Sequence, residues 1–395
     1  MATADPIVIS SYARTPIGGF LGRLSGVSAT ELGAVAVREA VKRAGVDIET
    51  IDQIFMGCVL PAGLGQAPAR QAALKAGLPR SVQATTVNKV CGSGLQSAIL
   101  AAGMLATDSA DVVVAGGMES MSNAPYLLAK HRTGARIGHD RMADSMYLDG
   151  LEDAYDTGRL MGAFADETAR TRQITRAAQD EFALQSLERA RAAQANGSFE
   201  REIVPVTVAG RKATETVTRD EQPERADPAR ISTLKPAFSE DGTVTAANAS
   251  SISDGAAALV MTRASVAKKL GLPVVARVVA HAAHAQAPSE FTTAPVPAIR
   301  KALDRAGWST ADVDLYEVNE AFAVVALVAM HELAIPREKL NVNGGACALG
   351  HPIGASGARL LATLLAALES RDAKRGVVSL CIGGGEGIAM AVERI

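Results

Sequence analysis

Two of the four cysteines border glycine-rich turns, which makes them candidates for covalent or acid–base chemistry. Cys91 begins the turn CGSG before an alanine-rich segment, so small neighbours leave its sulfur approachable and a helix dipole would favour its thiolate. Cys381 begins the similar turn CIGGG. An isolated cysteine is more often a small buried apolar residue, and we interpret Cys58 and Cys347 in that way.

His351 is the candidate partner of the nucleophile. It lies in LGHPIGASG, where a proline and several glycines fix the backbone. A cysteine and a histidine in one site make an activated thiol. We predict no metal site, and His281 and His284, three residues apart in an expected strand, point to opposite faces. The other histidines are interpreted as surface residues: His131, His139 and His331.

An internal repeat explains how these residues could meet. Residues 36–58 align without a gap on residues 298–320, and the identities include RAG at 43–45 and at 305–307. The agreement covers a helix, its glycine stop and the next strand, which favours duplication over chance similarity between alanine-rich helices.

Duplication brings corresponding turns together near a pseudo-twofold axis. Cys91 corresponds within about two residues to His351, and Asn319 and Cys381 fall at the ends of expected strands in the second copy. Open α/β sheets bind ligands at such strand ends. We therefore expect these four side chains to share one site.

The elements that would position them are α/β. The first copy has a helix bounded by a capping box, Ser28 with Glu31, and by Gly45. Residues 95–106 are apolar all round, as in a buried helix, and residues 111–117 form an apolar run typical of a strand covered on both faces. The pattern predicts two sheets, flanked by helices, that share a buried helical layer.

Three segments follow from the repeat. Residues 1–120 and 274–395 are the expected core halves, and residues 121–273 are an inserted, more charged loop domain whose ends return to the core. The insertion contains a basic loop at 131–141 and a charged helix expected at 175–196.

Composition excludes several classes of function. Lys and Arg total 40 against 42 Asp and Glu, so the formal charge of −2 does not favour nucleic acid or an anionic membrane. No segment is long and apolar enough for a membrane span, and reduced thiols suit a cytoplasmic protein. CGSGLQS departs from the dinucleotide fingerprint at Ser97, and there is no Walker A pattern.

Five ordered motifs carry a family resemblance: VNKVCGSGLQSA around Cys91, GGMESMSNAPY, NEAF from Asn319, NVNGGACALGHPIGASG around His351, and CIGGGEG from Cys381. The sequence resembles the thiolase family along essentially its whole length, and its bacterial acetyl-CoA acetyltransferase branch in particular. The resemblance implies a five-layered αβαβα core and a homotetramer in which the basic loop helps association. It implies no cofactor other than coenzyme A, which is part of the substrate.

The resemblance also implies the chemistry. Two acetyl-CoA molecules would condense to acetoacetyl-CoA and CoA, with the reverse thiolysis, by a ping-pong route through acyl-Cys91. His351 would activate Cys91, Cys381 would be the base, Asn319 would hold a water at the enolate, and the N–H groups of Cys91 and Gly383 would form the oxyanion hole.

Three alternatives stay open. A degradative thiolase would act on longer or branched 3-ketoacyl-CoA. A decarboxylating ketoacyl synthase would need no base such as Cys381. A silent acyl-CoA-binding member should lack one of the four reactive residues, which are all present.

Residues implied to contact CoA are Met161, Arg225, Ala237, Phe238, Ala246, Ser250, Phe291, Ala321 and Phe322. Several positions depart from the family pattern. Leu160 replaces a common His, Phe291 and Ala294 fall in a segment that usually carries Met and a GxGP pattern, Cys347 replaces an aliphatic residue and Glu386 replaces an uncharged one. The segment around Arg225 is about two residues short of the family pattern.

Overall fold

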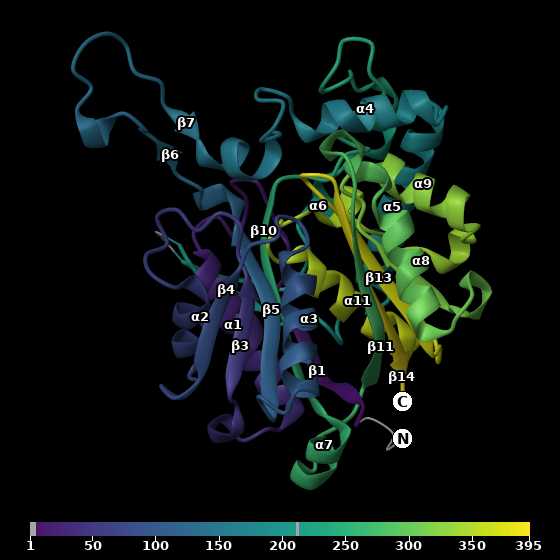
Figure 1. Cartoon of the computed structure of the whole chain (residues 1–395). Coiled ribbons are helices and arrows are strands. Elements are labelled where there is room, and N and C mark those ends of the chain that lie inside the picture. Colours follow the sequence, from purple (N-terminus) through teal and green to yellow (C-terminus); the bar gives the residue numbers. More distant parts are fainter. Residues whose placement is uncertain (1–4, 211–212) are drawn as a thin grey trace.

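The computed structural model describes residues 5–210 and 213–395, which form one hydrogen-bonded path of strands in two equivalent halves (Figure 1). The first half has the order β4 (Gln83–Val87), β3 (Gln53–Gly57), β5 (Val112–Ser120), β10 (Ser253–Arg263), β1 (Ile7–Arg14). The second has the order β12 (Leu315–Val318), β13 (Arg375–Ile382), β14 (Glu386–Arg394), β11 (Ala276–Ala285), which matches β3, β5, β10 and β1 in turn.

The pairing directions repeat as well. β3–β5 and β12–β13 are parallel, whereas the strands that follow them in each order pair antiparallel. The two halves join where β1 meets β11, at Val8–Arg277 and Ile9–Ala276. The predicted duplication is confirmed, and the two predicted sheets are linked through this short pairing.

Helices complete five layers around the strands (Figure 1). α3 (Ser93–Ala106) and α11 (Ser356–Ser370) contact each other and strands of both halves, so they form the shared buried layer. α1 (Ala29–Ala44) and α2 (Pro68–Ala76) cover the outer face of the first half. α8 (Pro295–Ala306), with α9 (Ala323–Leu333) packed on it, covers the second.

Glycine permits the close approach of the two central helices. A Cβ on Gly94 would lie 2.7 Å from the backbone nitrogen of Ala358, and a Cβ on Gly357 would lie 2.2 Å from that of Leu95. Any side chain at either position would collide with backbone. The two helix N-termini, and the turns before them, therefore meet at the centre of the molecule.

Local sequence signals place the outer helices. Ser28 and Glu31 form the predicted capping box of α1, and Gly45 ends it with a φ of 63°. Thr175 caps α5 (Arg176–Ala195), in agreement with the expected charged helix.

The segment between β5 and β10 lies over the site-bearing end of the core (Figure 1). The predicted unit 121–273 also includes a core strand, because its AAALVM patch is part of β10, which pairs with β5 and β1. The three-part division itself remains a prediction. The smaller elements here are β6 (Tyr126–Leu127), β7 (Ala143–Asp144), α4 (Met161–Thr171), β8 (Val206–Ala209), β9 (Thr214–Val217) and α6 (Gln222–Arg225).

The remaining short elements are β2 (Gly18–Gly19), α7 (Ala264–Leu270) and α10 (Ala346–Leu349). The region of β6 and β7 projects as an arm from the body (Figure 1). Within the part of the chain that the structure describes, no helix combines the length and apolarity needed to cross a membrane.

Candidate active site

A cavity of about 340 Å³ lies where both core halves meet the segment above them. Cys91, His351, Cys381 and Gly383 all contribute to its wall. Asn319 is fully buried and contacts His351. The structure thus brings together the residues that the sequence singles out.

Eight of the nine predicted CoA contacts line the same cavity: Met161, Ala237, Phe238, Ala246, Ser250, Phe291, Ala321 and Phe322. Arg225 does not, and lines a neighbouring pocket. The wall is mostly apolar with a few reactive groups, as is typical of small-molecule sites.

The turn that presents Cys91 is strained. Val90 has a φ of 45°, which is an outlier for a β-branched residue. Its N–H donates to Asn88 Oδ1 at 3.0 Å, and its carbonyl accepts from Ser93 Oγ at 2.7 Å. The same hydroxyl accepts the Lys89 N–H at 2.8 Å, so local hydrogen bonds hold the sharp bend between β4 and α3.

The Cys91 thiol is protonated at rest. Burial raises its pKa to about 11, and the charge of Glu119 adds to this, while the N–H groups of Gly383 and of Cys91 itself oppose it. The expectation that the helix dipole favours the thiolate is therefore wrong for the free protein, because desolvation outweighs the dipole. The two N–H groups that act on the sulfur are those of the predicted oxyanion hole.

Hydrogen bonds define the tautomer of His351. Ser356 Oγ donates to the Pro352 carbonyl at 2.9 Å, so it accepts from Nδ1–H of His351 at 2.5 Å. Nε2 then carries a lone pair and accepts from Asn319 Nδ2 at 3.3 Å. Burial, with the charge of Arg359, lowers the pKa of His351 to about 3. The ring is a neutral base whose unprotonated nitrogen is Nε2.

Asn319 follows β12, and its backbone N–H donates to the Ser379 carbonyl at 2.9 Å. Its buried side-chain oxygen has no hydrogen-bond partner among residues 5–210 and 213–395. A buried amide oxygen without a hydrogen bond is costly in free energy, so the Asn319 oxygen is suited to accept a hydrogen bond from a polar group such as water. The next residue, Glu320, accepts from Asn341 Nδ2 at 2.8 Å and from Ser186 Oγ at 2.7 Å, which anchors the NEAF segment.

Cys381 is the penultimate residue of β13 and is buried. Burial raises the pKa of its thiol well above the usual range, and a thiolate at Cys91 would raise it further. Both cysteines are therefore neutral until a reaction step removes a proton.

Glu119, which the sequence reasoning missed, ties the two copies together. Its buried carboxylate accepts the N–H groups of Val59 at 2.9 Å and Gly354 at 2.8 Å, one from each half. Burial raises its pKa to about 7. The residue lies within the GGMESMS motif, but nothing in the motif alone indicates its partners.

Other lining residues also escaped sequence reasoning: Tyr147, Gly150, Leu151, Gly162, Ala249, Ser251, Ile252 and Ile353. Half of them, namely Ala249, Ser251, Ile252 and Ile353, come from irregular segments, where periodicity carries no signal.

The correspondence of the copies needs a small correction. Because α3 and α11 begin at Ser93 and Ser356, Cys91 is equivalent to Gly354, three residues after His351.

The residues that depart from the family pattern lie in different surroundings. Leu160 lines the cavity, and Phe291 packs edge-on against Phe322 with ring centroids 6.4 Å apart. Glu386 forms an ion pair with Lys89, which joins the start of β14 to the turn before Cys91. Cys347 has a raised pKa because of burial and lies outside the catalytic cavity wall.

Comparisons with known proteins agree with this arrangement. The family "Thiolase, N-terminal domain" matches residues 7–265, and "Thiolase, C-terminal domain" matches residues 272–394. Acetyl-CoA acetyltransferase 2 of Arabidopsis thaliana is 53% identical over 391 residues, covering 98% of this chain and 96% of the relative. Acetyl-CoA acetyltransferase of Escherichia coli K12 is 51% identical over 390 residues, covering 98% and 99%.

A solved structure shares the whole fold. The crystal structure of the Bacillus anthracis acetyl-CoA acetyltransferase superposes with a TM-score of 0.97 at 40% identity and covers 100% of both chains. The two family domains span nearly all of the sequence, in the order that the duplicated core requires. This chain therefore belongs to the thiolase family.

Proposed function

We propose that the protein is an acetyl-CoA C-acetyltransferase, which condenses two acetyl-CoA to acetoacetyl-CoA and CoA and catalyses the reverse thiolysis. The observation that carries the proposal is the convergence of Cys91, His351 and Cys381 on one cavity. The names of the relatives, which align over nearly the whole chain, support the same substrates.

In the first half-reaction Cys91 attacks the acetyl-CoA thioester and gives its proton to His351 Nε2. The N–H groups of Cys91 and Gly383 stabilise the tetrahedral oxyanion. The intermediate collapses, the bond to the CoA sulfur breaks, and the leaving CoA thiolate takes the proton of Cys381. The products are acetyl-Cys91, CoA, a Cys381 thiolate and a protonated His351.

In the second half-reaction the Cys381 thiolate removes a proton from the methyl group of another acetyl-CoA. The enolate oxygen accepts from Nε2–H of His351 and from a water held by Asn319. The carbanion attacks acetyl-Cys91, and the Cys91 thiolate that leaves recovers its proton from His351. All three side chains return to their neutral resting states, in keeping with the raised thiol pKa values and the lowered His351 pKa.

An aromatic cluster favours short acyl groups. Phe291 contacts Phe164 and Phe322 edge-on, each with centroids 6.4 Å apart, and Phe238 contacts Phe322 at 6.0 Å. Because three of these rings line the cavity, they reduce the space for a long acyl chain. The alternative, a degradative thiolase for longer or branched chains, needs that space.

Thiolysis against a ladder of straight and branched 3-ketoacyl-CoA tests the proposal, together with trapping of labelled acetyl on Cys91. We expect the highest kcat/KM with acetoacetyl-CoA. A maximum at a long chain would favour the degradative alternative, and a label on another residue would reject Cys91 as the nucleophile.

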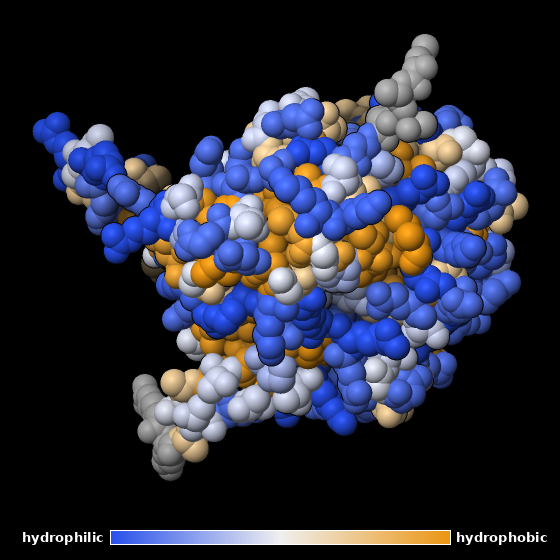
Figure 2. All heavy atoms as spheres, turned by 90° about the horizontal axis from the view of Figure 1, so that it is seen from below, coloured by the Kyte–Doolittle hydropathy of each residue, from blue (hydrophilic) through white to orange (hydrophobic). Residues whose placement is uncertain are grey.

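The finer expectations belong to the same proposal: a homotetramer assisted by loop 131–141, a cytoplasmic location, a role in fatty acid metabolism and no resident cofactor. Exposed apolar side chains on the arm, such as Ile137 and Met142, support association. Broad apolar patches on the face seen from below agree with buried subunit contacts (Figure 2). Light scattering before and after deletion of residues 131–141 measures the assembly.

A further inference from the structure

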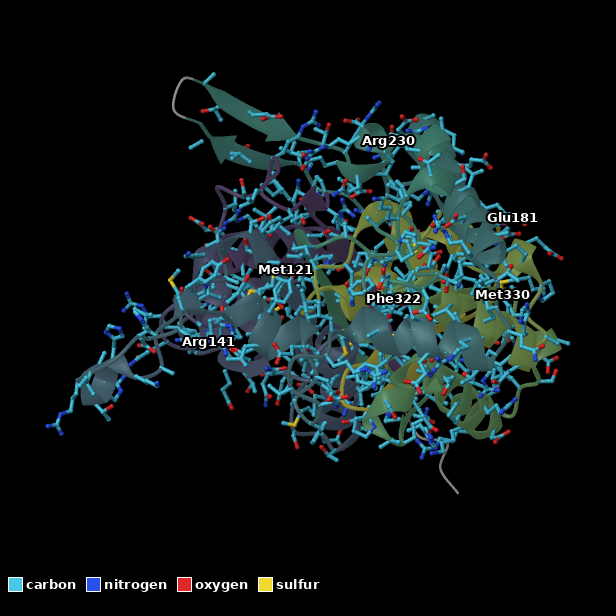
Figure 3. All side chains as sticks on the ribbon, turned by 90° about the horizontal axis from the view of Figure 1, so that it is seen from above. Met121, Arg141, Glu181, Arg230, Phe322 and Met330 are labelled. Carbon is cyan, nitrogen blue, oxygen red and sulfur yellow. The ribbon has the colours of Figure 1, made fainter. Side chains whose placement is uncertain are left out.

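A set of charged side chains is buried where α11 contacts β12 and β1. Arg359 of α11, Glu317 of β12 and Arg14 of β1 are each at most 1% exposed, and Glu202, which accepts from Arg14 Nε at 2.7 Å, is fully buried. Figure 1 shows α11 between the two core halves, and Phe322, four residues beyond β12, lies near the centre of the molecule in Figure 3. Water therefore screens these charges far less than it screens charges at the surface.

The two buried arginines differ in what compensates them. Arg14 donates to Glu202 and, through Nη1 and Nη2, to Asp220 at 2.7 and 2.9 Å. Arg359 Nη1 lies 3.8 Å from Glu317 Oε2, which is close enough for an ion pair but too far for a hydrogen bond.

The Arg359–Glu317 pair is joined by charge rather than by direct hydrogen bonds. Within the described ranges, none of the three guanidinium nitrogens of Arg359 and neither oxygen of Glu317 has a hydrogen-bond partner. Internal water normally bridges buried polar groups of this kind. Burial also raises the pKa of Glu317, so its carboxyl balances the charge of Arg359 only in part.

The pair is adjacent in the chain to the two residues that hold the ring of His351. Ser356, which accepts Nδ1–H of His351, is one helical turn before Arg359 on α11. Asn319, which donates to Nε2, is two residues after Glu317. The pair therefore connects the helix and the strand whose ends orient both nitrogens of the ring.

The charge of Arg359 opposes protonation of His351. The thiols of Cys91 and Cys381 share the cavity with the ring and are neutral at rest. Glu119 of β5 accepts an N–H group of the turn after His351 at 2.8 Å, and its pKa of about 7 leaves it partly protonated near neutral pH. Burial and the positive charge of Arg359 lower the pKa of His351 to about 3.

We propose that Arg359 is a positioning residue for His351: it pairs α11 with β12 through Glu317, and its fixed charge makes the protonated ring release its proton readily. The inference rests on the proposed function, in which His351 takes the proton of Cys91, donates a hydrogen bond to the enolate oxygen and finally returns the proton to Cys91. A more acidic imidazolium is the better donor in both later steps. Arg359 forms and breaks no bond in the reaction, since it acts only through His351.

The experiment follows the His351 ring by NMR titration of the purified full-length protein and measures kcat for condensation and thiolysis across the pH range. Arg359→Met removes the charge and keeps a long unbranched side chain. It should raise the titration midpoint of His351 by at least about one pH unit, because the opposing cation is gone. It should also lower kcat for condensation about tenfold, because the protonated ring becomes a weaker acid towards the enolate.

Two single variants separate the charge from the shape of the side chain. Arg359→Lys keeps the charge and should keep the wild-type midpoint, whereas lysine would not replace the planar guanidinium in a purely structural role. Arg38→Met, on the exposed side of α1, is the matched control and should change neither value. A wild-type midpoint with an unchanged kcat in Arg359→Met would overturn the proposal.

A double variant keeps the test decisive if Arg359→Met does not fold. Removing one partner of a buried ion pair is strongly destabilising, whereas replacing both with apolar residues of similar volume is often tolerated. Arg359→Met combined with Glu317→Leu should therefore fold and show the same rise in the His351 midpoint, and a wild-type midpoint there would equally reject the proposal. The titration needs no turnover. Wild-type protein without acetoacetyl-CoA thiolysis would thus refute the proposed function and leave the midpoints to decide the role of Arg359.

Discussion

The side-chain nitrogen of Asn319 lies 3.3 Å from Nε2 of His351, and this contact joins the end of β12 to the turn before α11. The amide donates, so it holds the imidazole with its lone pair at Nε2. A buried ion pair lies close to this contact in the sequence. Arg359 of α11 is 3.8 Å from Glu317, which lies two residues before Asn319. This pair connects α11 with β12, next to the residues that make the contact.

Asn319→Asp should reverse the direction of this contact. A carboxylate cannot donate to Nε2, so it would favour a protonated ring and raise the pKa of His351 from its value of about 3. In the variant, His351 is therefore protonated and inactive as a base at low pH, and it becomes a base again as the pH rises through its new pKa. We expect a fall in kcat of about 10²-fold near neutral pH, with an acidic limb that the wild type lacks.

The pH profile of acetyl transfer to Cys91 and the NMR titration of His351 check this prediction. Asn196→Asp, at the exposed end of α5, is the matched charge control and should change neither. An Asn319→Asp profile parallel to the wild type at all pH values would contradict the assigned hydrogen-bond direction.

Alkylation of Cys91 should be slow at neutral pH and rise with pH. Only the thiolate reacts, and burial raises the pKa of Cys91 to about 11, so the rate should increase about tenfold per pH unit up to that value. Iodoacetamide labelling followed by peptide mass spectrometry measures it site by site. Free cysteine, with a pKa of about 8.5, should level off at a lower pH in the same samples. A plateau for Cys91 below pH 8 would show that the resting thiol is activated after all.

Gly357→Ala should destabilise the fold through a steric clash between the central helices. The added Cβ would lie 2.2 Å from the Leu95 nitrogen, and neither helix can move without disturbing a sheet. We expect a loss of about 1–3 kcal/mol in the free energy of unfolding, measured by urea denaturation. Gly103→Ala in α3 is the matched control, because a Cβ there meets nothing within 4 Å. It should be neutral or stabilising by up to about 1 kcal/mol, as alanine favours the helix.

Sequence patterns predicted which residues meet, but not the protonation states that solvent exclusion sets. Cys91 and His351 stand in turns, and Cys381 stands at the end of a strand, at places that the duplication brings together, so their convergence was predictable. The position of Cys91 at the start of a helix could also be predicted. Its burial could not, because burial is a property of the folded chain, and burial reverses the expected pKa shift. Glu119 was missed for a similar reason: its partners, Val59 and Gly354, come from distant segments.

Cys381→Ser should separate the two half-reactions. Acetyl-CoA should still acetylate Cys91, because the attack depends on His351 and on the N–H groups of Cys91 and Gly383. The CoA thiolate that leaves can then take its proton from protonated His351 in place of Cys381. Condensation should fail, since a serine hydroxyl is far too weak an acid to supply the base for the methyl proton. Intact-mass measurement should find the acetyl adduct, and acetoacetyl-CoA formation should fall by at least about 10²-fold.

Cys347→Ser is the control for replacing sulfur with oxygen elsewhere in the core. The Cys347 thiol donates to the Asn248 carbonyl at 3.5 Å, a bond that a serine hydroxyl can also make, and it lies outside the catalytic cavity wall. We expect this variant to acetylate and condense at close to the wild-type rate. Normal condensation by Cys381→Ser would remove Cys381 as the base. Failure of both variants to accept acetyl would instead mean that sulfur-to-oxygen changes disturb the core, and Cys381→Ala would then repeat the test without a new hydroxyl.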